Sequence, residues 1–94
     1  MMNEDSTMIK QHNLKILPEH FNPVYEGIKT AELRKNDRDY SVGDTLNLCE
    51  WDGVNFTGRF VKREIIHIAD VGSYLEGFVL LSIKPSPEID YLMW

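Results

Sequence analysis

Short segments in which apolar and polar residues alternate, separated by proline and glycine, constrain the fold of this 94-residue chain more than any other feature. Alternation with a period of two is typical of strands that bury one face. The segment 78–83 (Phe-Val-Leu-Leu-Ser-Ile) is almost wholly apolar, which predicts a buried central strand. The other predicted strands are 12–17, 30–34, 45–51 and a long one from Phe56 to about Ile68.

The long strand follows a strong hairpin signal at Asp52-Gly53 and is expected to bend near Gly58. Its predicted apolar side consists of Val61 and Ile65 and, after a bulge, Ile66 and Ile68. In the strand 45–51, the alternation predicts that Leu46, Leu48 and Glu50 share one face and that Thr45, Asn47, Cys49 and Trp51 share the other.

The segment 18–27 predicts a helix in two pieces. Pro18 suits a first turn, and Asn22 is a good N-cap for a second piece that begins at Pro23. Gly27 is the expected C-terminal cap. The apolar residues at helical spacing are Phe21, Val24, Tyr25 and Ile28.

One early helix, four or five strands and closely spaced turns predict a mainly β (α+β) fold. We expect a small, mostly antiparallel β-barrel of about five strands, with the N-terminal helix at one end. The segment 69–77 is too short for the second helix that a ferredoxin-like sandwich needs. The expected organisation is a flexible lead at 1–10, one barrel domain at 11–84 and a tail at 85–94.

Charge and composition exclude several classes of function. The net charge is −5, but residues 10–84 hold 10 basic and 11 acidic side chains, a balance of only −1. Binding to a long duplex needs many basic contacts and is not expected, whereas a nucleotide or short single strand remains compatible. Cys49 is the only cysteine, and we interpret it as a core or strand residue. No apolar run is long enough to span a membrane and the N-terminus is polar, so a cytoplasmic location is expected.

The segment 29–38 carries the main functional signal, because four basic and two acidic residues give it a local charge of +2. If 30–34 is a strand, Ala31 and Leu33 face one side, while Thr30, Glu32 and Arg34 face the other. With Lys29 at the strand's entry, a carboxylate and a guanidinium on one face could bind a planar, hydrogen-bonding ligand. The alternative is an ion pair that closes the barrel wall without a ligand.

Other polar and aromatic side chains leave the same two alternatives open. Arg38, together with Lys15, could contact a phosphate or belong to a solvated turn with Asn36 and Asp37. Tyr40 and Trp51 could stack on a base or pack in the core, and His12 could hydrogen-bond in the cleft. The histidines His12, His20 and His67 are scattered and predict no metal site, and we expect no cofactor. The candidate ligand-binding residues are therefore Lys29, Glu32, Arg34, Arg38, Lys15, His12 and Tyr40.

Four sequence patterns together resemble the ASCH domains of the PUA-like superfamily, and among them the short bacterial and phage proteins. These patterns are His12-x-Leu14-Lys15-Ile16, the run Gly27-x-Lys29-x-x-Glu32-x-Arg34-Lys35-Asn36-Asp37-Arg38 preceded by Phe21 and Val24, the turn Val42-Gly43-Asp44, and Glu50-Trp51-Asp52. The resemblance covers residues 11–84. It implies a β-barrel with a cleft beside the first helix and a role in binding RNA or a nucleotide-like ligand.

Some ASCH proteins are amidohydrolases that remove the acyl group of N4-acetylcytidine with a lysine, a threonine and a glutamate. By resemblance, their lysine matches Lys29, but their threonine falls at Glu32, and their glutamate has no assignable counterpart, although Glu76 lies nearby in sequence order. Two of the three positions do not carry over, which disfavours that activity. If the chain were such an enzyme, Lys29 and Glu32 would be its catalytic pair.

The first hypothesis is therefore a binding module for RNA, a nucleotide or a modified base. The amidohydrolase is the second hypothesis. An interaction protein without a small ligand is the third, and a weak homo-oligomer is compatible with each of them. The tail 91–94 (Tyr-Leu-Met-Trp) is expected to pack rather than to carry chemistry.

Overall fold

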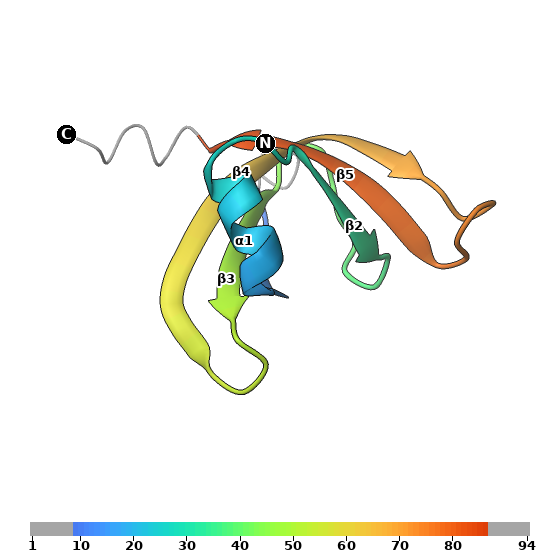
Figure 1. Cartoon of the computed structure of the whole chain (residues 1–94). Coiled ribbons are helices and arrows are strands. Elements are labelled where there is room, and N and C mark those ends of the chain that lie inside the picture. Colours follow the sequence, from blue (N-terminus) through green and yellow to red (C-terminus); the bar gives the residue numbers. More distant parts are fainter. Residues whose placement is uncertain (1–8, 87–94) are drawn as a thin grey trace.

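The computed structural model of the chain, which describes residues 9–86, shows a mostly β domain (Figure 1). Five strands form one sheet that curls into a half-barrel, and one short helix packs against it. The elements are β1 (Gln11–Ile16), α1 (Pro18–Tyr25), β2 (Ala31–Lys35), β3 (Thr45–Trp51), β4 (Phe56–Asp70) and β5 (Phe78–Pro85). The predicted fold class is confirmed. The expected lead at 1–10 and tail at 85–94 lie largely outside the described residues.

The strand order is β1-β3-β4-β5-β2, so β1 and β2 are the two edges of the sheet. β1 pairs with β3 in parallel, and the other neighbours are antiparallel. The half-barrel is therefore open between β1 and β2, at a boundary that we call the seam. Backbone hydrogen bonds do not join the two strands there, so side chains must close the gap.

The concave face of the sheet holds the core. Leu46, Leu48, Ile65 and Leu81 are fully buried, and Phe21 and Val24 of α1 cover them. β5 is a central strand, as its apolar sequence predicted, although its outward side chains are only half-buried. The predicted faces of β1 and β3 are also confirmed, because Leu14, Ile16, Leu46, Leu48 and Glu50 are all buried.

Two irregularities shape the long strand β4. Its register against β3 shifts between Cys49 and Trp51, where Gly58 takes a φ of 98°. Its register against β5 shifts between Ile65 and His67, which confirms the predicted bulge. The expectation that Ile66 joins the apolar side is wrong, because the extra residue of a bulge leaves the alternation and Ile66 is 45% exposed.

The helix differs from its prediction. α1 is one continuous helix that begins after Leu17, with Pro18 in its first turn and Pro23 inside it. Asn22 is not an N-cap, because it lies inside α1, and its side-chain oxygen instead accepts a hydrogen bond from Arg59 Nη2 at 2.9 Å. The missing N–H of Pro23 costs one hydrogen bond, which a short helix held by packing tolerates.

The C-terminal end of α1 follows the sequence more closely. Gly27, at φ 81°, donates its N–H to Val24 O at 3.0 Å, and Ile28 N donates to Pro23 O at 2.9 Å. This pattern is a Schellman cap and confirms the role of Gly27. Buried Arg63 on β4 also donates to the carbonyl of Val24 at 2.9 Å, which fixes the helix end to the sheet. The expected apolar face is narrower than predicted, since Tyr25 and Ile28 are exposed.

Candidate functional site

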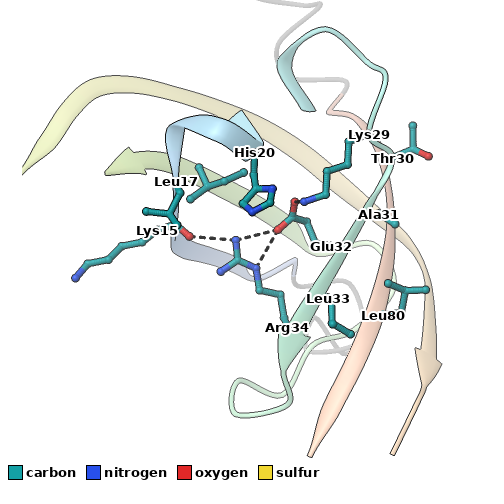
Figure 2. Close-up of a pocket in the computed structure, with 11 residues that line it drawn as sticks. Lys15, Leu17, His20, Lys29, Thr30, Ala31, Glu32, Leu33, Arg34 and Leu80 are labelled. Atoms are coloured by element: carbon teal, nitrogen blue, oxygen red, sulfur yellow. Dashed lines mark hydrogen bonds and ion pairs between the residues drawn. The ribbon is translucent and has the colours of Figure 1, made fainter. Parts of the chain in front are cut away.

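A cavity of about 640 Å³ lies at the seam, between β2 on one side and the end of β1 and start of α1 on the other (Figure 2). Pockets for small ligands in proteins have about this size. We call it the seam cavity. Its lining residues are Lys15, Ile16, Leu17, His20, Lys29, Thr30, Ala31, Glu32, Leu33, Arg34 and Leu80.

Glu32 is the centre of the polar wall of the seam cavity. Its side chain is only 4% exposed, and both carboxylate oxygens carry partners. Oε2 accepts from Lys29 Nζ at 2.9 Å, and Oε1 lies 3.1 Å from Arg34 Nε and 2.9 Å from Arg34 Nη2. A carboxylate this buried is stable only when it is paired. The Glu32 side chain can therefore occupy this position only because Lys29 and Arg34 neutralise its charge.

The alternation of β2 places this group. Glu32 and Arg34 stand opposite Leu81 and Val79 of β5, on the face of the sheet that holds the core. Leu33 points the other way and is 51% exposed. The predicted faces of this strand are therefore correct: the charged face is turned inward and the apolar residue is left outside.

Two guanidinium groups cross the seam. Arg34 Nη2 donates to Lys15 O at 3.1 Å, and Arg38 Nη1 donates to Asn13 O at 3.4 Å. Both carbonyls belong to the edge strand β1, where they have no neighbouring strand to pair with. Arg34 thus joins the buried carboxylate to the opposite edge of the half-barrel (Figure 2).

The other predicted site residues lie in different places. The backbone of Lys15 lines the seam cavity, but its side chain points away from Glu32 (Figure 2) and its Nζ lies 4.2 Å from the centre of the Trp51 ring. His12 and Tyr40 do not line the cavity. They form a separate cluster in which their rings are 4.8 Å apart, edge to face.

Sequence reasoning missed two lining residues from α1 and its N-cap, His20 and Leu17. They are three residues apart, which is the spacing of one helical face, and this was the available signal. It placed Glu50 on the same face as Leu46 and Leu48 but missed the partners of this buried carboxylate, which accepts from Arg59 Nε at 2.9 Å and from Thr57 Oγ1 at 2.7 Å. These hydrogen bonds lower the pKa of the Glu50 carboxyl. This ion pair lies outside the seam cavity and joins β3 to β4.

Asp44 anchors the His12 cluster. His12 Nε2 lies 2.9 Å from Asp44 Oδ2, and the carboxylate also accepts the backbone N–H groups of Lys10 and Ser41. Burial alone would raise the pKa of the Asp44 carboxyl, but these hydrogen bonds outweigh burial and lower the pKa below its ordinary value. Burial raises the pKa of the neighbouring Tyr40 phenol, although the positive charges of Arg34 and Arg38 act to lower it.

This arrangement predicts a pH-dependent stability. At pH 7, Asp44→Asn is expected to lower the free energy of unfolding by about 2 kcal/mol, because hydrogen bonds to a charged group are lost. A carboxyl whose folded pKa is depressed contributes fully above its unfolded pKa of about 3.9, and its contribution disappears as the pH falls through the folded value. Urea unfolding of wild type and variant at pH 7 and at pH 3 measures the difference. A gap as wide at pH 3 as at pH 7 would contradict the assignment.

Metal and membrane signals are weak in the described part of the chain. No group of three or more His, Cys, Asp and Glu side chains among residues 9–86 could hold a metal ion. None of the helices in that range is long and apolar enough to cross a membrane. Cys49 is a free, half-buried cysteine on β3.

The fold and the cavity define a class of protein: a single small half-barrel domain with a charged cavity at its open seam. The family described as "Domain of unknown function (DUF3850)" matches residues 11–83, which run from the start of β1 into β5, and the chain belongs to this family. It is similar to the "Uncharacterized 12.9 kDa protein in GpA 3'region" of Escherichia phage P2. The two are 47% identical over 74 residues, which cover 79% of this chain and 68% of the phage protein.

Proposed function

We propose that the seam cavity binds a nucleobase or nucleotide, which would make this protein a nucleic-acid or nucleotide-binding module. One observation carries the proposal. A buried carboxylate holds an ammonium and a guanidinium in fixed positions on one wall of an open cavity. Groups held in place before binding lose little conformational entropy when a ligand arrives.

The polar wall keeps hydrogen-bonding capacity for a ligand. A carboxylate offers about four acceptor positions, and the three contacts to Glu32 leave one for an exocyclic amine or a ring N–H. Lys29 uses one of its three N–H donors on Glu32, and Arg34 retains both donors of Nη1. These donors suit a carbonyl or phosphate oxygen.

The resemblance to ASCH domains supports the same ligand class, since it implies a nucleotide-like or RNA ligand beside the first helix. We infer that the chain is a member of the PUA-like superfamily on this ground. Leu17 and His20, at the start of α1, lie on the wall opposite Glu32, which agrees with that location. The cytoplasm, where RNA and nucleotides are found, is the compartment this proposal requires.

A titration of the ¹⁵N-labelled protein tests the proposal. Nucleoside monophosphates, N4-acetylcytidine and short RNAs are added, and the backbone and side-chain shifts are followed. We expect the largest changes at Lys29, Glu32, Arg34 and His20. Lys29→Gln is expected to weaken binding about tenfold, as the loss of a charged hydrogen bond does. Lys84→Gln is the matched control, because Lys84 is an exposed lysine outside the cavity.

The same experiment separates the competing functions. Chromatography of the N4-acetylcytidine sample would reveal deacylation above a Lys29→Ala background, and that result would assign an amidohydrolase instead. No shift change at residues 29–38 with millimolar ligand would leave Lys29, Glu32 and Arg34 as a structural network of two ion pairs and remove the proposal.

A further inference from the structure

A second hollow of about 420 Å³ lies beside the seam cavity, and we call it the outer hollow. Three of its seven lining residues are cationic, Lys15, Arg34 and Arg38, and none is acidic. This is notable in a chain whose net charge is −5. Phe56, which is 59% exposed, forms an aromatic part of the wall.

The two hollows are adjacent, since they share two lining residues. Lys15 and Arg34 line both of them. The Arg34 guanidinium spans the boundary, since it contacts Glu32 of the seam cavity and the Lys15 carbonyl on the edge of β1. A ligand that fills the seam cavity and continues past Arg34 therefore enters the outer hollow.

Lys15 is a cation stacked on aromatic rings rather than paired with an acid. Its Nζ lies 4.2 Å from the centre of the Trp51 ring and 5.9 Å from that of Phe56. Among residues 9–86 it has no carboxylate partner. Aromatic rings that carry an unneutralised cation suit a ligand that is both planar and anionic.

The aromatic surface extends further along the outside of the sheet. A third depression of about 480 Å³ shares Asn13, Cys49 and Phe56 with the outer hollow and adds Phe60, which is 54% exposed. A series of cations followed by exposed aromatic rings is the arrangement that proteins use to follow a single-stranded backbone and stack its bases.

We propose that the ligand of this protein is a single-stranded nucleic acid rather than a free nucleotide. One base occupies the seam cavity, the adjoining phosphate lies against Arg34, Arg38 and Lys15, and the next base stacks on Phe56 in the outer hollow. This inference rests on the proposed function of the seam cavity and adds the length and path of its ligand.

Affinity as a function of ligand length tests the inference. The monophosphates and the hexamers of adenosine, cytidine and uridine are titrated at one salt concentration. Deoxyribose hexamers are titrated beside them to show whether the protein prefers RNA or DNA. Six equivalent bases give at most a sixfold statistical gain. We expect the best hexamer to bind at least about thirtyfold more tightly than its monophosphate, because one more stacked base and one more phosphate contribute.

Two variants locate the added affinity. Phe56→Ala and Lys15→Gln are expected to bring the hexamer back to within sixfold of the wild-type monophosphate affinity. Phe56→Ala should leave the monophosphate affinity unchanged, because Phe56 does not line the seam cavity. For the hexamer, Lys15→Gln should also reduce the slope of log K against log salt by about 0.7, as the loss of one phosphate contact to a single strand does. Phe56→Ala should leave that slope unchanged. Tyr74→Ala and Lys84→Gln are matched controls, since both residues are exposed and line none of these three hollows.

The failures of the two proposals differ. Monophosphate binding at Lys29 and Glu32 with a hexamer gain of sixfold or less overturns this inference and leaves the proposed function standing. A hexamer gain that survives both Phe56→Ala and Lys15→Gln also overturns it, because the extra contacts then lie elsewhere. Absence of binding by every probe overturns both.

Discussion

Glu32→Gln is expected to lower the free energy of unfolding by about 3 kcal/mol. The substitution keeps the shape of the side chain but removes the charge that Lys29 and Arg34 neutralise. Removing one partner of a buried ion pair costs roughly 3–5 kcal/mol, and the lower end applies because the two cations are 34% and 21% exposed and water can screen them. For a small domain this is a large part of the total stability.

Chemical denaturation of Glu32→Gln beside Glu64→Gln measures this effect. Glu64 lies 3.9 Å from Lys84 in a more exposed pair, so its substitution is expected to cost less than about 1 kcal/mol. Nucleotide binding should disappear in Glu32→Gln under conditions where the variant remains folded, and it should persist in Glu64→Gln. Equal stability losses in the two variants would mean that the Glu32 side chain is not buried between cations.

Leu81→Ala is expected to cost about 3–4 kcal/mol, the range for removing a fully buried leucine. Leu81 stands opposite Glu32 in the register between β5 and β2, so it lies beside the charged wall on the core face of the sheet. The cavity left by the alanine would also loosen the support of that wall.

Leu33→Ala is the matched comparison, because Leu33 is the next residue of β2 after Glu32 and is 51% exposed. We expect a loss below about 1 kcal/mol. Urea unfolding curves of both variants, analysed with a shared slope, give the two values. If Leu33→Ala were as costly as Leu81→Ala, β2 would present its apolar face to the core, and the charged wall would not exist.

Local periodicity explains why much of the fold could be predicted. Strand alternation needs only neighbouring residues, so it correctly placed Leu33 on one side of β2 and Glu32 and Arg34 on the other. The Schellman cap at Gly27 is local in the same sense. The bulge in β4 was expected, but which residue leaves the core depends on pairing with β5, and this is why Ile66 was misplaced.

Contacts between distant segments explain the remaining differences. Asn22-Pro23 is typical of a helix start, yet α1 continues through it, and the Asn22 side chain binds Arg59, 37 residues later, instead of capping a helix. Asp44 lies 32 residues from His12, and the two pair in a cluster that does not line the seam cavity. No short-range pattern reports such partners, and the crossing of Arg34 to the edge of β1 depends on the closure of the whole sheet.

Intermolecular NOEs from a bound nucleotide test the central claim of a ligand site at the seam most directly. With ¹³C-labelled protein and an unlabelled monophosphate, we expect NOEs from the base or H1′ protons to the Leu17 methyl groups and the His20 ring, which face Glu32 across the cavity (Figure 2). NOEs confined to other parts of the molecule, with none to Leu17 or His20, would contradict the account.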